Sequence, residues 1–193
     1  MKVTIIDYGA GNIKSIQFAF NRLGVEAILT NNSEEIKSAD RVIFPGVGEA
    51  SSAMNMLKRS KLNLLIPELK QPVLGICLGM QLLCNFTEEG NTQGLGVFDV
   101  SVKRFSDALK VPQMGWNSIT DLKSPLFKNN NEQDYMYLVH SYFAEVCNQT
   151  IAKTNYGLTY SSALQNKNFY GVQFHPEKSS TAGEQILKNF IEL

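Results

Sequence analysis

The sequence predicts an α/β fold with a mostly parallel sheet, helices on both faces of that sheet, and an antiparallel extension. In the first half, short apolar runs rich in β-branched residues alternate with segments whose apolar residues recur at helical spacing. In the second half, strand-like runs follow one another with few helical segments between them. The first pattern is typical of parallel strands buried between helices, and the second is typical of antiparallel strands.

The first half contains four expected strands. They are the runs KVTIID (2–7), VEAILT (25–30), RVIF (41–44) and PVLGI (72–76). A helix is expected between the first two strands, because apolar residues recur at helical spacing over 13–23 and a glycine follows. Further helices are expected from about Glu49 and over LGMQLLCNF (78–86).

The second half predicts four more strands and a last helix. The strand-like runs are VFDVSV (97–102), YMYLVHS (135–141), TIAKTN (150–155) and NFYGVQF (168–174). We expect these strands to extend the same sheet in antiparallel fashion. NNNEQD (129–134) is interpreted as an exposed loop, and an amphipathic helix is expected at about 181–191.

Composition and charge restrict the class of protein. The 193 residues are 44% hydrophobic and contain no repeat or linker, which predicts one domain over 1–193. The 18 Lys and Arg residues balance 18 Asp and Glu residues, so no nucleic-acid partner is expected. No apolar run approaches the roughly 20 residues that cross a bilayer, and no signal peptide is visible at the N-terminus. We therefore expect a cytoplasmic protein without a membrane partner.

Cofactor and metal sites have little support in the sequence. The third glycine of a dinucleotide-binding G-x-G-x-x-G would fall at Lys14, and no phosphate-binding G-x-x-x-x-G-K occurs. The two histidines, His140 and His175, have no third ligand nearby in the sequence, and the three cysteines form no C-x-x-C pair. We expect no cofactor, no metal ion and no disulfide framework.

Cys77 is the candidate nucleophile. It lies between Gly75 and Gly79 in GICLG, where a strand is expected to turn into a helix. A nucleophile on such a turn needs small neighbours, because the backbone is strained and the surroundings are crowded. The amide of Leu78 and the start of the helix would favour both a thiolate and a developing oxyanion. The other two cysteines are interpreted as small buried hydrophobic residues.

A candidate base lies in GVQFHPEKSS (171–180). Pro176 disfavours the α conformation at His175, so we expect an extended chain that places Glu177 on the same side as the imidazole. A carboxylate on one ring nitrogen fixes the tautomer and leaves the other nitrogen free to take the thiol proton. The side chain of His140 has no carboxylate at comparable spacing, and a structural role is expected for it.

The loop FPGVGEA (44–50) provides candidate oxyanion donors. With Gly46 and Gly48, the loop could present a peptide N–H, such as that of Val47, to a bound carbonyl. Together with the Leu78 amide, this N–H would complete an oxyanion hole. Taken alone, the segment fits an ordinary turn between a strand and a helix better, and only the neighbouring elbow at Cys77 favours the oxyanion role.

Taken together, these motifs resemble the class I, or triad, glutamine amidotransferases. GICLG and HPE are motifs of that superfamily, in which the triad residues follow one another along the chain as cysteine, histidine and, two residues later, the acid. Within the family, IDYGAGN, FPGVG, QMGWN (113–117), VHSY and HPEKS resemble the glutaminase subunits of imidazole glycerol phosphate synthases. Met80 stands where the anthranilate synthase relatives would carry histidine. The resemblance extends from the first strand to the last helix.

The resemblance implies a fold and an activity. The fold is a Rossmann-like, flavodoxin-type domain, and the activity is hydrolysis of L-glutamine to glutamate and ammonia through a Cys-His-Glu triad and a γ-glutamyl thioester. The oxyanion donors would be the amides of Val47 and Leu78. The residues implied to hold glutamine are Gly46, Gly48, Gln81 and the backbone of His140, Ser141 and Tyr142.

The resemblance also implies a partner. Ammonia would pass to a separate cyclase subunit with a (βα)8 barrel, and the two subunits would form a heterodimer in histidine biosynthesis. Lys178, one residue beyond Glu177, is expected at the edge of the docking face. The resemblance adds Tyr137 and Trp116 as partner contacts, which suits the preference for aromatic residues at interfaces.

Three alternatives remain open. The chain could be the glutaminase subunit of another class I amidotransferase. A cysteine hydrolase or peptidase of the same superfold could use the same triad, and it would cleave peptides instead of free glutamine. A noncatalytic flavodoxin-like binding module would keep its function when Cys77 is replaced.

Overall fold

The computed structural model describes residues 1–193, which form an 11-stranded sheet, a two-stranded sheet and helices packed around them. The α-helices are α1 (Ile13–Arg22), α2 (Ser33–Lys37), α3 (Ala50–Arg59), α4 (Leu62–Leu65), α5 (Leu78–Leu83) and α6 (Ser180–Glu192). The strands of the large sheet are β1 (Val3–Ile6), β2 (Ala27–Thr30), β3 (Arg41–Phe44), β4 (Val73–Ile76), β5 (Cys84–Thr87), β6 (Thr92–Gln93), β7 (Phe98–Arg104), β10 (Tyr142–Ala144), β11 (Thr150–Asn155), β12 (Thr159–Asn166) and β13 (Phe169–Val172). The small sheet contains β8 (Gln113–Ser118) and β9 (Tyr135–His140).

The parallel part of the large sheet confirms the predicted α/β fold. Five strands, in the spatial order β2-β1-β3-β4-β13, are all parallel to one another. Every residue of β1, β4 and β13 is buried, as expected for strands covered on both faces. All four strands expected in the first half are present, with bounds that differ from the expected runs by at most two residues at either end.

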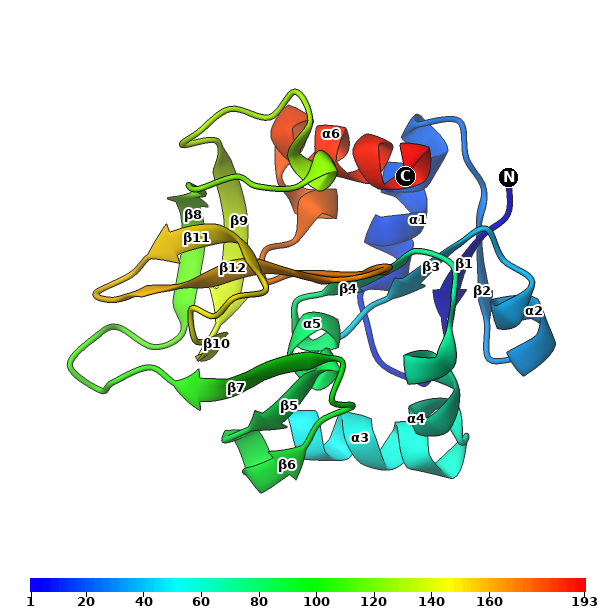
Figure 1. Ribbon diagram of the computed structural model, residues 1–193, viewed down its shortest axis with the longest axis horizontal. Coiled ribbons are helices and arrows are strands. Elements are labelled where there is room, and N and C mark those ends of the chain that lie inside the picture. The colour runs from blue at the N-terminus through cyan, green and yellow to red at the C-terminus, as the bar shows by residue number, and fades with distance from the viewer.

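Helices cover both faces of this sheet (Figure 1), so the sheet separates two apolar cores. On one face lie α1 and α6, and their side chains Phe20 and Phe190 belong to one core cluster. On the other face lie α3, α4 and α5, and Leu57 and Leu62 belong to the second cluster. The helices expected over 13–23, from about Glu49 and over 181–191 correspond to α1, α3 and α6.

Antiparallel strands extend the sheet beyond β13, as the sequence predicts. Here β12 pairs with β13, β10 with β12, and β7 with β10, each in antiparallel fashion. The expected strands VFDVSV and TIAKTN correspond to β7 and β11.

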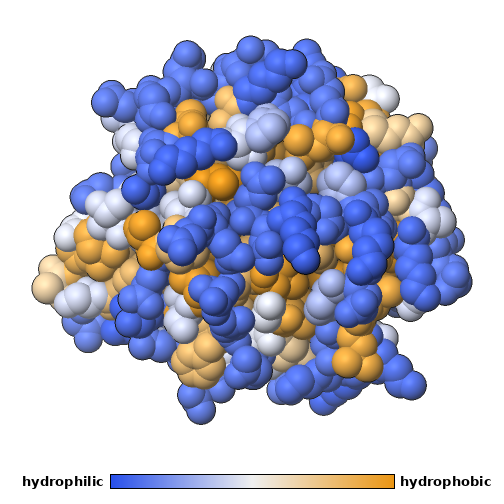
Figure 2. All heavy atoms as spheres, in the orientation of Figure 1, coloured by the Kyte–Doolittle hydropathy of each residue, from blue (hydrophilic) through white to orange (hydrophobic).

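The surface is mostly hydrophilic on the face seen in Figure 2, which has the orientation of Figure 1. Hydrophobic areas lie between the hydrophilic side chains. None of the helices has both the length and the apolar character that crossing a bilayer requires.

Two expected strands take a different place from the one predicted. NFYGVQF forms β13, which pairs in parallel with β4 and continues the parallel sheet instead of starting the antiparallel part. YMYLVHS forms β9, which leaves the large sheet and pairs with β8. Strand pairing of this kind joins segments far apart in the chain, and local apolar patterns do not encode it.

The helix expected over 78–86 is shorter than predicted. α5 ends at Leu83, and the chain continues as β5. The amides of Leu95 and Val97 donate to the carbonyls of Leu82 and Leu83, 2.8 Å in both cases. A continuing helix would need these carbonyls for its own hydrogen bonds, so the tertiary contact ends the helix.

Candidate active site

The candidate site lies at the carboxyl ends of three neighbouring strands. Because β3, β4 and β13 are parallel, their carboxyl ends meet at one edge of the sheet. The loop with Gly46 follows β3, Cys77 follows β4, and His175 lies three residues beyond β13. This edge is where open α/β sheets bind their ligands. The topology therefore brings together residues that are about 30 and 100 positions apart in the sequence.

Cys77 occupies a strained turn between β4 and α5. Its φ and ψ are 54° and −112°, and a positive φ is uncommon for a residue other than glycine. Its amide donates to the carbonyl of Val172 at 2.8 Å, which fixes the turn against β13. The residue is 8% exposed. The structure thus has the sharp strand-to-helix turn predicted from the sequence.

The two flanking glycines are required by close backbone contacts. A Cβ on Gly79 would collide with the carbonyl oxygen of Phe44, at the end of the neighbouring strand. A Cβ on Gly75 would stand 2.9 Å from the amide nitrogen of Met80, in the first turn of α5. Side chains at these positions would push α5 away from the sheet and displace the turn that holds Cys77.

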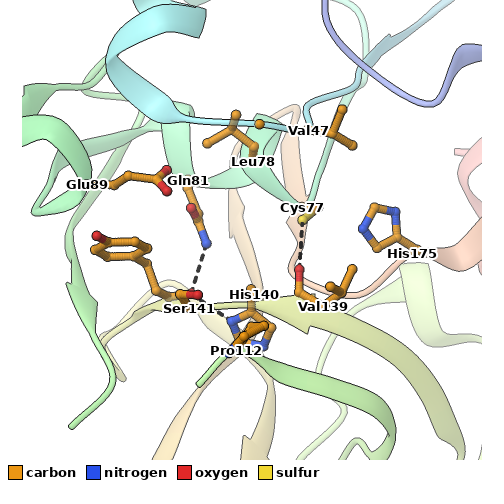
Figure 3. Close-up of a pocket in the computed structure, with 12 residues that line it drawn as sticks. Val47, Cys77, Leu78, Gln81, Glu89, Pro112, Val139, His140, Ser141 and His175 are labelled. Carbon is orange, nitrogen blue, oxygen red and sulfur yellow. Dashed lines mark hydrogen bonds between the residues drawn. The ribbon is translucent and has the colours of Figure 1, made fainter. Parts of the chain in front are cut away.

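His175 and Glu177 form a buried pair beside this turn. The Nδ1 atom of His175 lies 2.8 Å from Oε1 of Glu177, and the two side chains are only 3% and 1% exposed. The Nε2 atom of His175 is also buried, and it has no hydrogen-bond partner. Figure 3 shows the ring beside Cys77. The carboxylate fixes one ring nitrogen, and the other nitrogen is left for a proton transfer.

The chain conformation at this pair was predicted only in part. His175 is extended, with φ −100° and ψ 95°, as expected. Glu177, however, lies in a 3₁₀ turn over Pro176–Lys178, and the prediction of an extended chain there was wrong. The fixed φ of proline suits the first position of a helical turn. The carboxylate still reaches the imidazole.

The surroundings of His175 favour its charged form. Burial by itself lowers the pKa of His175, but the adjoining Cys77 sulfur and Glu177 carboxylate outweigh burial and raise it to about 10. A protonated imidazole stabilises a neighbouring thiolate. The charged imidazole is therefore placed to stabilise negative charge on the adjoining sulfur.

The second histidine has a different environment. His140 is buried, its Nδ1 donates to the carbonyl of Tyr142 at 2.7 Å, and its ring packs against Phe105 and Tyr160. Burial lowers the pKa of His140 to about 4, against an opposing effect of the Tyr142 hydrogen bond. This histidine is therefore neutral at physiological pH, consistent with the structural role expected for its side chain.

A cavity of about 310 Å³ opens between these elements. Besides Cys77 and His175, its lining includes seven of the residues expected from the sequence, namely Val47, Gly48, Leu78, Gln81, His140, Ser141 and Tyr142. Gly46 is not part of the lining. It packs against the turn, where an added Cβ would stand 2.5 Å from the amide nitrogen of Gly79.

The loop after β3 has backbone N–H groups available for an oxyanion. The amides of Val47 and Gly48 donate to no acceptor within the chain, and Gly48 has a φ of 98°. The Leu78 amide belongs to the first turn of α5, where helical amides have no partner within the helix. Figure 3 shows the side chains of Val47 and Leu78 near Cys77.

Two polar residues of the site were missed in the sequence. Glu89 is the only carboxylate in the cavity lining, and one of its oxygens accepts from the amide of Ala50 at 3.0 Å. Burial raises the pKa of Glu89, partly offset by that hydrogen bond. Gln173 lies 3.7 Å from the Cys77 sulfur. Glu89 follows a segment without a recognisable motif, whereas Gln173 was detectable as the residue two positions before His175 on an extended chain.

The family model described as "Glutamine amidotransferase class-I" matches residues 4–193. The chain belongs to the class I glutamine amidotransferases.

This amidotransferase is similar over its whole length to known relatives. It is 56% identical to the "Imidazole glycerol phosphate synthase subunit HisH" of Bacteroides fragilis, and the match covers 100% of both chains. It is 46% identical to the subunit of the same name from Haemophilus influenzae, with 100% of this chain and 98% of that chain covered.

Solved structures share the fold at low sequence identity. The crystal structure of a glutamine amidotransferase superposes with a TM-score of 0.77 at 18% identity, covering 98% of this chain and 97% of that chain. A chain in the structure of PurLQS from Thermotoga maritima gives a TM-score of 0.77 at 15% identity, covering 100% and 99%. This likeness confirms the α/β fold of the amidotransferase.

The three residues expected at a partner interface form one cluster on the amidotransferase. Trp116 on β8 is directly opposite Tyr137 on β9, and their ring centroids are 6.2 Å apart. The Nζ atom of Lys178 lies 5.7 Å from the centre of the Tyr137 ring. Tyr137 in turn lies beside His175, with 6.4 Å between the ring centroids. The cluster therefore adjoins the candidate active site.

Proposed function

We propose that this chain is the glutaminase subunit of imidazole glycerol phosphate synthase, and that residues 1–193 act as one domain. It hydrolyses L-glutamine to glutamate and ammonia and passes the ammonia to a cyclase subunit of the HisF type. The observation that supports this assignment most strongly is the 56% identity, over both full lengths, with a relative named as the HisH subunit of that enzyme.

In the first half of the reaction, the Cys77 thiolate attacks the side-chain carboxamide carbon of glutamine. The amides of Leu78 and Val47 bind the oxyanion that develops on the carbonyl oxygen. The Nε2 atom of His175 gives its proton to the departing nitrogen, so ammonia leaves and a γ-glutamyl thioester remains on the sulfur. The free, buried Nε2 atom beside Cys77 supports this role.

In the second half, water replaces ammonia in the cavity. His175, now neutral, takes a proton from the water, and the resulting hydroxide attacks the thioester carbon. The carbon–sulfur bond breaks, glutamate leaves, and the thiolate and imidazolium are restored. Glu177 holds the ring in one tautomer throughout and stabilises its positive charge, as its 2.8 Å contact with Nδ1 allows.

The cavity wall holds the amino-acid end of glutamine. Glu89, as the only carboxylate of the lining, suits the α-ammonium group of the substrate. Both N–H groups of Gln81 are used within the chain, so its carbonyl oxygen is the atom left to face the substrate. Gly48 and the backbone at 140–142 shape the remaining wall, and Gly46 supports it from behind by packing against the turn at Gly79.

The cyclase subunit covers the cluster of Trp116, Tyr137 and Lys178 to form a heterodimer. Ammonia must reach its acceptor before it is protonated and lost, so the acceptor subunit has to adjoin Cys77 and His175. The 6.4 Å distance between the Tyr137 and His175 rings supports this placement.

Glutamate release from glutamine, measured with and without a HisF-type (βα)8 cyclase and its ligand, tests the proposal. We expect activity in the complex, complete loss in Cys77→Ala, and full activity in Cys84→Ala, whose thiol is buried. Product formation from glutamine with the cyclase identifies the pathway. Glutamine hydrolysis that serves only another acceptor would assign the chain to a different amidotransferase, and cleavage of peptides without cleavage of glutamine would make it a peptidase.

A further inference from the structure

Gln173 is a fully buried polar residue between β13 and His175. It is 0% exposed, and its backbone amide donates to the carbonyl of Ser162 at 2.8 Å, which fixes the chain at this point. A buried side-chain amide is costly unless its polar atoms have partners. The partners of Gln173 are the reacting sulfur and a residue of the cavity wall.

The side chains of Gln81 and Gln173 form a hydrogen-bonded chain that ends on Cys77. The Nε2 atom of Gln81 donates to the carbonyl of Tyr142 at 2.9 Å and to Oε1 of Gln173 at 2.8 Å. The Nε2 atom of Gln173 then donates to Sγ of Cys77 at 3.7 Å. The chain thus joins the backbone at the cavity wall to the sulfur in three steps.

The orientation of both amides follows from the first of these contacts. A backbone carbonyl can only accept, so the carbonyl of Tyr142 requires the NH₂ group of Gln81 to face it. The same nitrogen contacts Gln173, which must therefore present its oxygen to Gln81. The NH₂ group of Gln173 is then left to face the sulfur. Each amide is held in one orientation by the network, and a flip of either would place two acceptors or two donors against each other.

The partners of the sulfur have opposite preferences for its protonation state. The carbonyl of Val139, 4.0 Å from the sulfur, can accept only from the protonated thiol. An N–H donor is most strongly bound by the thiolate, because hydrogen bonds to charged groups are the stronger ones. The sulfur donates to the carbonyl of Val139 only as a thiol, whereas Gln173 donates an N–H group to the sulfur.

We propose that Gln173 is a positioning residue that orients the Cys77 sulfur and stabilises its thiolate, and that Gln81 holds Gln173 in the orientation this requires. The inference rests on the proposed function, because it assigns Gln173 to the same nucleophile. It adds a donor to the thiolate that is independent of His175. It also gives Gln81 a second role. The oxygen of Gln81 faces the substrate, and its nitrogen holds Gln173, which in turn orients the nucleophile.

The experiment is alkylation of Cys77 by iodoacetamide as a function of pH, with the modified cysteine identified by peptide mapping. In Gln173→Met, which keeps the length but removes the donor, we expect the pH midpoint to rise by about one unit, which is a roughly tenfold loss of thiolate at pH values well below the midpoint. In Gln173→Glu, which keeps an acceptor for Gln81 but adds a negative charge, we expect a larger rise. Gln165→Met is the matched control, because Gln165 bonds Ser124 and Tyr170 away from the site, and its midpoint should equal that of the wild type.

An unchanged midpoint in Gln173→Met, with thermal unfolding like that of the wild type, would overturn the proposal. If the substitutions prevent folding, the side-chain amide protons of Gln173 in the wild type provide the test by NMR. They should shift with the same pH midpoint as alkylation, and protons that do not respond would refute the contact. None of these readouts needs glutamine, so a wild type that hydrolyses no glutamine would refute the proposed function alone.

Discussion

At the scale of single residues, the site depends on the strained backbone conformation of Cys77. A non-glycine residue with φ 54° and ψ −112° is strained by about 1–3 kcal/mol. The hydrogen bond to Val172 and the close approach of α5 to β3 at Gly79 hold this conformation. The turn places the sulfur beside His175, and these contacts offset the strain.

The first prediction concerns the charge on His175. Burial lowers the pKa of His175, and the carboxylate of Glu177 is one of the groups that raise it. In Glu177→Gln the imidazole keeps an acceptor for Nδ1 but loses the negative charge, so we expect its pKa to fall by about 1–3 units. NMR titration of the ring in a Cys77→Ala background, with and without Glu177→Gln, measures this change free of the thiolate.

The same substitution has a kinetic consequence. Glu177 orients the base and transfers no proton, so Glu177→Gln should reduce glutamine turnover less than His175→Ala does. Equal losses in the two variants, with an unchanged His175 titration in the first, would contradict the role given to the carboxylate.

The second prediction concerns His140 and stability. Burial lowers the pKa of His140 from 6.5 to about 4, so between these pH values the unfolded chain binds a proton that the folded chain does not. The stability contribution of the neutral ring is therefore present above about pH 6.5 and is lost as the pH falls toward 4. From pH 7.5 to pH 5, the wild type should lose about 2 kcal/mol more unfolding free energy than His140→Gln, at 1.36 kcal/mol per pH unit. Urea unfolding at both pH values measures this difference, and parallel losses in the two proteins would disprove the buried, neutral state.

At the scale of elements, the sequence predicted best what depends on local patterns. The parallel strands, α1, α3, α6 and the turn at Cys77 follow from apolar spacing and from the glycines beside the thiol. The end of α5 at Leu83 and the parallel pairing of β13 follow from contacts with segments far away in the chain, which spacing does not reveal. The partners of Gln173 were beyond prediction for the same reason.

The third prediction concerns the connection between β9 and the turn at His175. Ser179 is fully buried, and its Oγ accepts from the amide of Tyr137 at 2.9 Å and donates to the carbonyl of His175 at 2.6 Å. Ser179→Ala leaves both backbone groups without this partner, so we expect a loss of about 2 kcal/mol in unfolding free energy. Without this bridge the backbone at His175 is free to move, so the turnover number for glutamine should also fall.

The matched control is Ser180→Ala. Ser180 is the next residue, is exposed, and makes no side-chain hydrogen bond in the chain, so its replacement should change unfolding free energy by less than about 0.5 kcal/mol. Similar effects of the two substitutions, measured by urea unfolding, would contradict the bridging role of Ser179.

At the scale of the whole molecule, the small sheet β8–β9 stands beside the edge of the large sheet where the active site lies. The backbone of Tyr137 accepts a hydrogen bond from the amide of His175, and the carbonyl of Val139 faces Cys77. The outer face of the small sheet exposes Trp116. A partner bound there contacts the same strand that lines the active site.

The fourth prediction is that the isolated chain is a poor glutaminase. The loop with Val47 is exposed, and a glycine lies on each side, so nothing in the chain holds its N–H toward the oxyanion. A missing oxyanion donor reduces the rate by about 10²- to 10³-fold. Glutamate release should rise by a factor of this order when the cyclase and its ligand are added, and a purified chain with full activity by itself would contradict the prediction.

The fifth prediction concerns the docking face. Trp116 is 53% exposed although its ring contacts Tyr137, and Lys178 lies over the same tyrosine, so a partner can bury all three at once. Because large aromatic side chains dominate interface energies, Trp116→Ala should weaken cyclase binding by about 2 kcal/mol, roughly 30-fold. Lys178→Ala should raise the amount of glutamine consumed per cyclase product, because a gap in the proposed docking face beside His175 would let ammonia escape.

The matched control for the docking face is Leu64→Ala. Leu64 is 67% exposed on α4, on the other side of the large sheet, and its replacement should leave binding and coupling unchanged. Titration calorimetry with the cyclase, together with the ratio of glutamate to cyclase product, separates weakened docking from leakage of ammonia. If Trp116→Ala and Lys178→Ala both bind the cyclase normally and use one glutamine per product, the docking face is wrong and the partner must reach Cys77 from another side.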